Sequence, residues 1–334
     1  MNIKNMKNND VFKTFENNYK QFEQIFEEFA KSNLKNKFGQ IDKILVCGMG
    51  GSTLGPHFVK NAFLNKINVP IIISNEYNLP NWVDKKTLIV ISSFSGETEE
   101  SISCFREAQK KNLKTFIVCT GGNLSKEDSL KFVYNPKYNY AKNPRFAIGY
   151  SIAIFIVLLN KLGFLKYSIK DIIQHIKIFS KGKFQSKKIA QKIVSKIPVI
   201  IASEHLFGNA HIFNNQINET GKNFASYFSI PEICHHQFEG LEFPKNLNSQ
   251  IIYILIISNL YHRRNQKRYE IMKQILNKKK IKFIEIKAIG NNIFEEAMYV
   301  LGISSYVSFY LANFNRVDPQ PNPWVDYLKE NMKE

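Results

Sequence analysis

The chain has 334 residues, 44% of them hydrophobic and 22% charged, and its 46 lysines and arginines against 28 aspartates and glutamates give a formal net charge of +18. This composition is that of a globular protein with room for two domains of ordinary size. The four cysteines lie far apart without a C-x-x-C pair, which argues against a zinc site and a disulfide framework. Cys47, Cys104 and Cys119 fall within apolar or helical patterns and are expected to be core thiols.

The excess of basic residues has two interpretations. Lysine, asparagine, isoleucine and phenylalanine are abundant together, as an AT-rich genome would favour, and this composition bias explains the charge better than a nucleic-acid surface does. Nucleic acid is kept as a minor alternative, because no helix-turn-helix can be identified. In either case a positive field helps to collect an anionic substrate.

The chain shows no targeting or membrane segment. Its first ten residues are polar and lack the apolar core of a signal peptide. The longest apolar run, residues 152–159, is far shorter than the ~20 residues of a membrane span and is interpreted as a buried helix. Together with the cysteines, these features predict a cytoplasmic protein.

In chain order, the first half predicts an amphipathic N-terminal helix followed by alternating strands and helices. The first helix covers 12–38, strands cover 41–47, 69–73, 87–92 and 114–119, and later helices start near 52 and cover 98–111 and 145–162. Short apolar runs between helical patterns are typical of a parallel sheet covered on both faces.

The second half repeats this plan without repeating the sequence. Its strands are expected at 198–202, 250–257 and 281–286, and its helices at 168–195, up to 278, at 293–312 and at 324–329. The sequence therefore predicts an α/β protein with two lobes, residues 1–165 and 166–334, each a parallel sheet flanked by helices. Ligands of such sheets bind beyond the carboxyl ends of the strands.

Two loops at the ends of expected strands have the composition of a phosphate site. The segment SFSGET, residues 93–98, places three hydroxyls at the start of a helix, where unpaired N–H groups and the macrodipole favour an anion. The segment GMGGST, residues 48–53, follows the first strand. Each loop alone is equally well explained as a tight turn with a helix cap, but the two together predict a phosphorylated small molecule.

Nucleotide-binding motifs explain the same loops less well. Residues 48–53 approach G-x-G-x-x-G, but Thr53 occupies the position of the last glycine, and the chain contains no G-x-x-x-x-G-K-[ST]. Glu76 lies near where a ribose ligand would be expected, so a dinucleotide site is kept as a minor alternative.

A polar segment in the second half, residues 214–240, is predicted to form a helix and its loop and carries candidates for acid–base chemistry. Glu219 lies in its middle, and His235 and His236 follow a proline turn. Aldose–ketose isomerisation needs a carboxylate to move a proton between adjacent carbons and an imidazole or ammonium to open the sugar ring. Without context, Glu219 is a helix-surface charge and the histidines a solvated pair or a core histidine, and a metal site lacks further ligands at suitable spacing.

Two cations complete the candidates. Asn143-Pro144-Arg145 places an arginine at a helix start, where positive charge is mildly unfavourable, and its guanidinium could hold an enediolate oxygen. Lys329 lies in a short helix after the proline-rich turn at 318–323. Taken alone, Arg145 would be an ordinary surface arginine and Lys329 a solvated lysine.

These residues resemble the bifunctional phosphoglucose/phosphomannose isomerase family, whose members contain two sugar-isomerase (SIS) domains. The resemblance covers nearly the whole chain, in order, through the segments GMGGST, SSFSGETEE, TGG, PRFAIGY, the NE of NNQINET, PEICHH, SSYVSFYLANFNRVDPQP and the terminal LK. The hydroxyl loop is shared by all SIS domains, whereas the PR-x-A-x-GY, NE and DP-x-P segments are much more specific.

The resemblance implies an aldose–ketose isomerase that interconverts glucose 6-phosphate, and mannose 6-phosphate, with fructose 6-phosphate through a cis-enediol, without a metal or cofactor. It implies proton transfer by Glu219, stabilisation of the enediolate by Arg145, and ring opening by His235 and Lys329. The implied phosphate site consists of Gly50, Gly51, Ser52, Ser93, Ser95 and Thr98. It also implies a homodimer in which His235 reaches the site of the second subunit.

The sequence departs from the family pattern in two places. Glu97 stands where the loop usually has Asn, so its charge is expected either near the phosphate or pointing outward. His236 and Gln237 replace a common Asn-Glu, which could alter ring opening or the choice between glucose and mannose epimers. The alternative function is a non-catalytic regulatory protein that binds sugar phosphates, and retention of the four candidate catalytic residues argues against it.

Overall fold

The computed structural model describes residues 9–32 and 37–332. Within this part of the chain, two compact units are present. The first unit contains residues 16–177 and 292–297, and the second contains residues 9–15, 178–291 and 298–332.

This division differs from the predicted boundary at 165/166. Residues 166–177 lie with the first unit. The Asn160 side chain accepts from the backbone N–H of Tyr167 at 3.1 Å and donates to its carbonyl at 3.2 Å, and the Tyr167 ring packs edge-on against Phe63. These contacts hold the segment after residue 165 to the first unit.

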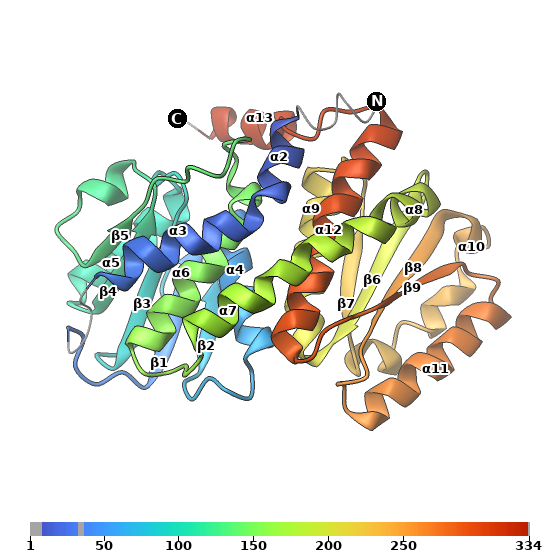
Figure 1. The fold of residues 1–334 in the computed structure, drawn as a ribbon, viewed down its shortest axis with the longest axis horizontal. Helices are drawn as coiled ribbons and strands as arrows, with labels where there is room; N and C mark the ends of the chain where they lie inside the picture. Colours follow the sequence, from blue (N-terminus) through green and yellow to red (C-terminus); the bar gives the residue numbers. More distant parts are fainter. Residues whose placement is uncertain (1–8, 33–36, 333–334) are drawn as a thin grey trace. The chain divides into compact units, whose positions relative to one another are not determined.

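The first unit is built on a five-stranded parallel sheet with the order β2-β1-β3-β4-β5 (Figure 1). The central strands β1 and β3 read KILVCG and TLIVIS, and nearly every residue in them is buried. Continuous apolar runs of this kind suit strands that are covered on both faces. The strands are β1 (Lys43–Gly48), β2 (Ile71–Ser74), β3 (Thr87–Ser92), β4 (Lys114–Cys119) and β5 (Lys131–Val133).

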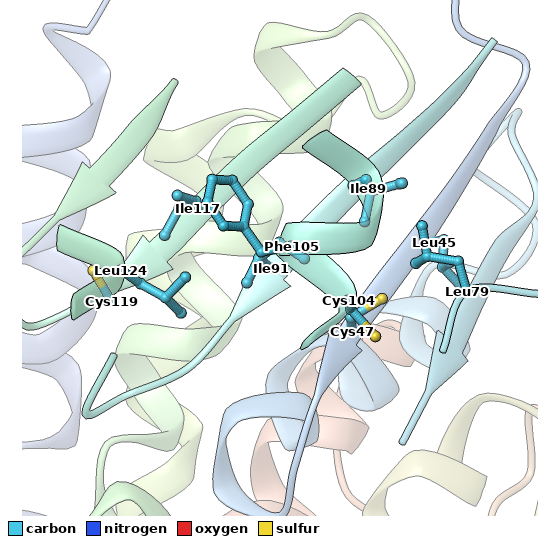
Figure 2. Close-up of a cluster of buried hydrophobic side chains, with 11 residues drawn as sticks. Leu45, Cys47, Leu79, Ile89, Ile91, Cys104, Phe105, Ile117, Cys119 and Leu124 are labelled. Carbon is cyan, nitrogen blue, oxygen red and sulfur yellow. The ribbon is translucent and has the colours of Figure 1, made fainter. Parts of the chain in front are cut away.

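One face of this sheet packs against α5 (Glu99–Lys110). Alternate residues of β1, β3 and β4 point to this face, as the two-residue period of a strand requires. The three cysteines predicted to be core thiols are buried and form no disulfide, which confirms that prediction. Figure 2 shows the resulting cluster, which includes Leu45, Cys47, Ile89, Ile91, Cys104, Phe105, Ile117 and Cys119.

The opposite face packs against α3 (Asn18–Ala30) and α6 (Ile148–Lys161). Phe29 of α3 stacks on Phe116 of β4 and Phe132 of β5, with ring centroids 5.9 and 4.3 Å apart. Almost all of α6 is buried, which confirms the buried helix predicted around residues 152–159. In the described ranges, no helix combines the length and the apolar character needed to cross a membrane. The other helices of this unit are α4 (Gly51–Ala62), α7 (Ile169–His175), η1 (Asn123–Lys126) and η2 (Pro144–Phe146).

The second unit contains a four-stranded parallel sheet with the order β7-β6-β8-β9, which matches β2-β1-β3-β4 of the first (Figure 1). Its strands are β6 (Ile197–Ser203), β7 (Ser226–Ile230), β8 (Ile251–Ile257) and β9 (Phe283–Lys287). Its helices are α8 (Lys183–Ile193), η4 (Glu204–Leu206), α9 (Phe207–Glu219), η5 (Glu232–His235), η6 (Glu239–Glu242), α10 (Leu247–Gln250), α11 (Arg263–Lys278) and α13 (Pro323–Asn331). The α/β class with two parallel sheets is thus confirmed.

Three elements connect the segments of the two units. They are α2 (Asp10–Glu16), η3 (Ile176–Gly182) and α12 (Ile293–Asn315). In the second unit, Phe12 of α2 packs against Tyr306 and Phe309 of α12, with ring centroids 5.9 and 5.4 Å apart.

Three predicted elements are corrected by the structure. The predicted helix 12–38 is wrong in extent, because Asn17 has non-helical angles between α2 and α3 and α3 ends at Ala30; residues 33–36 lie outside the described ranges. The predicted helix 168–195 is divided into α7, η3 and α8. The segment 214–240 contains the strand β7 as well as a helix and a loop.

Candidate active site

The pairing of β1 with β3 brings the two predicted phosphate loops to the same sheet edge. Gly48, the last residue of β1, is paired in register with Ser92, the last residue of β3. A Cβ atom at Gly48 would collide with the Ser92 carbonyl oxygen, so this close approach requires glycine. The loops 48–53 and 93–98 therefore leave the sheet side by side.

Ser52 joins the two loops. Its carbonyl accepts a hydrogen bond from the Ser92 hydroxyl at 2.8 Å, and its own hydroxyl accepts from the backbone N–H of Phe94 at 3.0 Å. Gly50 precedes this residue with a φ of +46°, which places it in the left-handed region that favours glycine. The predicted residues Gly50, Gly51 and Ser52 thus form a turn that is tied to the hydroxyl loop.

Ser93 organises the hydroxyl loop from within. Its side chain is completely buried, and its Oγ accepts from the backbone N–H groups of Gly96 at 3.1 Å and Thr98 at 3.4 Å. The same oxygen lies 2.8 Å from the Thr98 hydroxyl. Ser95 is exposed and Thr98 half-buried. Ser93 therefore shapes the loop, while Ser95, whose Oγ accepts from the backbone N–H of Glu97 at 3.1 Å, and Thr98 are its more accessible hydroxyl residues.

Thr98 is the N-cap of α5, but its side chain makes no cap hydrogen bond. The first N–H groups of a twelve-residue helix and its macrodipole therefore follow directly after the hydroxyl loop. This arrangement suits an anion with several acceptor oxygens, such as a phosphate group.

Glu97, the irregular member of this loop, binds a neighbouring turn. Its Oε1 accepts from the backbone N–H of Asn123 at 2.7 Å, and its Oε2 accepts from the Asn123 side chain at 2.8 Å. Of the two orientations expected for this carboxylate, the structure has it paired with Asn123. The charge of Glu97 thus serves to hold the loop 93–98 on η1.

The hydroxyl loop and the turn before η1 meet at their glycines. Gly96 has a φ of +73°, and a Cβ atom there would collide with the carbonyl oxygen of Gly121. Gly122 has a φ of +68°, and a Cβ there would lie 2.8 Å from Oε1 of Glu97. Glycine at these positions allows the β3–α5 loop and the β4–η1 loop to pack backbone against backbone.

Arg145 lies beside the glycine turn of the first loop. A Cβ atom at Gly51 would lie 2.9 Å from the backbone nitrogen of Arg145, so η2 packs directly against this turn. The arginine is only 4% exposed, and its guanidinium lies 4.6 Å from the centroid of the Phe146 ring. The interpretation of Arg145 as an ordinary surface arginine is therefore wrong.

Gln21 supports the turn that carries Arg145, a role that the sequence did not reveal. Its fully buried side chain donates to the carbonyl of Phe146 at 3.1 Å and accepts from the backbone N–H of Tyr150 at 3.3 Å. A Cβ atom at Gly149 would lie 2.7 Å from its Oε1, which explains the glycine before Tyr150. The available signal was a glutamine between apolar positions on the buried side of α3.

Glu219 ends α9 in the second unit and is half-buried. Its Oε2 accepts a hydrogen bond from Asn322 Nδ2 at 3.0 Å. Its backbone carbonyl accepts from Lys222 Nζ at 2.7 Å, and the same ammonium donates to Asn322 Oδ1 at 2.7 Å. The carboxylate is thus held by the segment that precedes α13, which sequence reasoning did not connect with it.

His235 and Lys329 are exposed side chains of the second unit, at the end of η5 and within α13. Of the two residues after His235 that depart from the family pattern, His236 is exposed with its Nε2 4.0 Å from Oε1 of Glu232. Gln237 instead turns its Oε1 toward the Tyr253 hydroxyl, which donates to it at 3.2 Å. Gln237 therefore ties the loop after η5 to β8 through Tyr253.

The second sheet has a different arrangement at the edge that corresponds to the phosphate loops. After β6, Glu204 has a φ of +44°, and its Oε1 accepts from the backbone N–H of His262, the N-cap of α11, at 2.9 Å. The side chain of Asn265 donates to the same oxygen at 2.7 Å. The start of α11 thus has a carboxylate of the chain itself as its anion.

The structure therefore brings the predicted residues together in two groups. The first unit joins Arg145 to the two loops that contain Gly50, Gly51, Ser52, Ser93, Ser95 and Thr98. The second unit joins Glu219 to the segment before α13, and presents His235 and Lys329 at its surface.

Comparisons with known proteins identify relatives of this chain. A family model of the bacterial phospho-glucose isomerase C-terminal SIS domain matches residues 183–332. The chain is 30% identical to a bifunctional phosphoglucose/phosphomannose isomerase of Aquifex aeolicus, with 97% of this chain and 99% of that protein covered. It is 28% identical to a protein of the same name from Caldicellulosiruptor bescii, over the same shares of both chains.

A solved structure supports the fold. The C-terminal domain of glucosamine-fructose-6-phosphate aminotransferase from Francisella tularensis has a TM-score of 0.68 to this chain at 14% identity, with 94% of this chain and 96% of that chain covered. Two SIS-type lobes, each a parallel sheet flanked by helices, are therefore confirmed.

Gly96→Ala tests the packing of the hydroxyl loop. We expect it to lower the free energy of unfolding by more than ~1 kcal/mol, because a left-handed backbone and a collision are combined at this position. Urea unfolding measures the loss. Gly39→Ala is the matched control, because Gly39 has a φ of +60° with no atom within 4 Å of the added Cβ. Equal losses in the two variants would contradict the close packing at Gly96.

Proposed function

Because the chain belongs to the bifunctional phosphoglucose/phosphomannose isomerase family, we propose that it is an aldose–ketose isomerase that interconverts glucose 6-phosphate and mannose 6-phosphate with fructose 6-phosphate through a cis-enediol. The observation that carries this proposal is the 30% identity over 99% of the Aquifex aeolicus protein. The same observation favours an enzyme over a non-catalytic protein that binds sugar phosphates.

The substrate phosphate binds at the two loops of the first unit. The exposed Ser95, the half-buried Thr98 and the N–H groups at the start of α5 supply donors, and Gly50, where an added Cβ atom would have no neighbour within 4 Å, leaves room for the phosphate oxygens. Ser52 and the buried Ser93 hold these donors in place through the hydrogen bonds that they make within the loops. This site fixes the end of the sugar that does not react.

Glu219 moves the proton between C1 and C2. It removes the proton from C2 of the open-chain aldose, the electrons of that C–H bond form the C1–C2 double bond, and the oxygen on C1 becomes negative. Arg145 stabilises this oxygen with its permanent positive charge. Return of the proton to C1, with a proton passing from the oxygen on C2 to that on C1, gives the ketose.

The enediol also explains activity on two epimers. C2 is planar in this intermediate, so the configuration that distinguishes glucose from mannose is lost there. Protonation of C2 from one face or the other then decides which aldose is formed. The preference between them depends on groups around the sugar and is left to measurement.

His235 and Lys329 open the sugar ring, and His235 acts in the site of a second subunit. The exposure of His235 within its own chain supports contact with another subunit. The exposed Trp324, Tyr327 and Leu328 of α13 provide an apolar surface of the kind that subunit interfaces cover. We accordingly assign a homodimer, and the buried free thiols fit a reducing cytoplasm.

Glu219→Gln tests the proton-transferring base. We expect kcat for fructose 6-phosphate to fall by about 10²–10⁴, the usual contribution of a general base, while the melting temperature stays near that of the parent. A coupled assay should score both glucose 6-phosphate and mannose 6-phosphate. Glu219→Asp, which keeps a shorter carboxylate, should retain more activity. Near-parental turnover of Glu219→Gln would show that the base assignment is wrong.

Thr98→Ala tests the phosphate site. A lost hydrogen bond to a charged group is worth about 1.5–3 kcal/mol, so we expect KM to rise about tenfold or more with a smaller change in kcat. Thr98→Ser keeps the hydroxyl and serves as the control. An unchanged KM in Thr98→Ala would count against this loop as the phosphate site.

Mixed dimers test whether His235 acts across subunits. Each of the single variants His235→Ala and Glu219→Gln should be nearly inactive. Co-expression of the two should restore about a quarter of the parental activity. In a random mixture of two-fold dimers, half of the dimers are mixed, and one of the two sites in each mixed dimer is intact. If His235 acts within its own chain, co-expression restores no activity.

A further inference from the structure

Asn322 occupies the N-cap position of α13 without capping that helix. An N-cap asparagine normally accepts a hydrogen bond from the first turn through its side-chain oxygen. In α13 this bond is absent. The Asn322 side chain instead donates from Nδ2 to Oε2 of Glu219 at 3.0 Å and accepts at Oδ1 from Nζ of Lys222 at 2.7 Å. The oxygen that could cap α13 thus accepts from Lys222, and the amide NH₂ group of the same side chain binds Glu219.

Lys222 fixes the orientation of this amide. An ammonium group can only donate hydrogen bonds, so the atom of Asn322 that faces Lys222 must be the oxygen, and the NH₂ group must then face Glu219. The three N–H groups of Lys222 are matched by three acceptors, namely Oδ1 of Asn322 and the carbonyls of Glu219 and Pro321. The turn after α9 and the segment before α13 are therefore held together at one point.

We propose that Asn322 is a positioning residue of the isomerase, which orients the Glu219 carboxylate by holding its Oε2, and that Lys222 acts through Asn322. This inference rests on the proposed role of Glu219. With Oε2 held, rotation of the carboxylate is restricted, and Oε1 is the oxygen that exchanges the proton with C1 and C2.

The same residue also joins the base to the helix of Lys329. Asn322 starts α13, and its carbonyl accepts from the backbone N–H of Asp326 at 3.0 Å. A shift of Asn322 would therefore move α13 relative to Glu219. Because both groups act on one sugar, a fixed distance between them preserves the productive geometry, and errors of about 1 Å can cost 10²-fold in rate.

The test compares Asn322→Ala with Asn315→Ala. Asn315 donates from its side chain to the carbonyl of Gly221 at 3.1 Å, so the control removes an asparagine that binds the backbone of the same turn and not the carboxylate. For Asn322→Ala we expect kcat for fructose 6-phosphate to fall by about tenfold to a hundredfold with KM changed by less than about twofold. Asn315→Ala should keep the parental kcat.

Asn322→Asp gives a second measurement that keeps the size of the side chain. It places a carboxylate against Oε2 of Glu219, and like charges disfavour ionisation. Lys222 is the charged group that faces this position and stays beside the new carboxylate. The like charge makes Glu219 harder to ionise, so the acid limb of the kcat/KM profile should move to higher pH. This variant also decides the matter if Asn322→Ala does not fold.

A double-mutant cycle tests the role of Lys222. If Lys222 acts through Asn322, Lys222→Met should lower kcat in the parent and add little to Asn322→Ala, because the effects of coupled residues are not additive. Full additivity would contradict that role.

The outcomes separate this inference from the proposed function. If Glu219→Gln is inactive but Asn322→Ala has a kcat within about threefold of the parent, or changes only KM, the positioning role is overturned while the base assignment stands. If Glu219→Gln keeps near-parental turnover, the base assignment fails and the role of Asn322 fails with it.

Discussion

The pairing of Gly48 with Ser92 at the carboxyl ends of β1 and β3 is the constraint on which the phosphate loops depend. The absence of a side chain at Gly48 lets the Ser92 carbonyl approach, and this register brings Ser52 within hydrogen-bonding distance of both Ser92 and Phe94. A shift of one residue in either strand would separate the loops and turn their side chains to the opposite face of the sheet. The register of two buried strands thus sets the geometry of the proposed anion site.

Much of the fold could be predicted from the sequence, because β1, β3 and α6 are strongly apolar and the hydroxyl loop directly follows β3. Local patterns could not reveal the division of the N-terminal helix at Asn17 or the strand β7, whose sequence SYFSI shows no regular alternation of polar and apolar residues and lies in a segment that is otherwise helix and loop. The resemblance supplied the roles proposed for Glu219 and Arg145. Spacing gave no sign that Gln21 supports the Arg145 turn or that Asn322 binds Glu219, since these partners are separated by 124 and 103 residues in the chain.

The two groups of candidate residues are held in different ways. The first unit places its loops by backbone packing at glycines and by short hydroxyl contacts, which leave little freedom. The second unit holds Glu219 through a chain of side-chain hydrogen bonds that passes through Asn322 to the ammonium of Lys222. The proposed phosphate site thus depends on backbone geometry, whereas orientation of the proposed base depends on an amide and a lysine that single substitutions can change.

Glu204 makes the two sheets unequal despite their shared strand order. Its carboxylate is covalently part of the chain, so the anion at the start of α11 is present at every phosphate concentration. In the proposed phosphate site, the start of α5 acquires its anion only when a ligand binds. Inorganic phosphate in the buffer would consequently raise the resistance of the first unit to heat and proteolysis, because a ligand stabilises only the folded region that binds it, and the second unit would keep the same resistance with or without it.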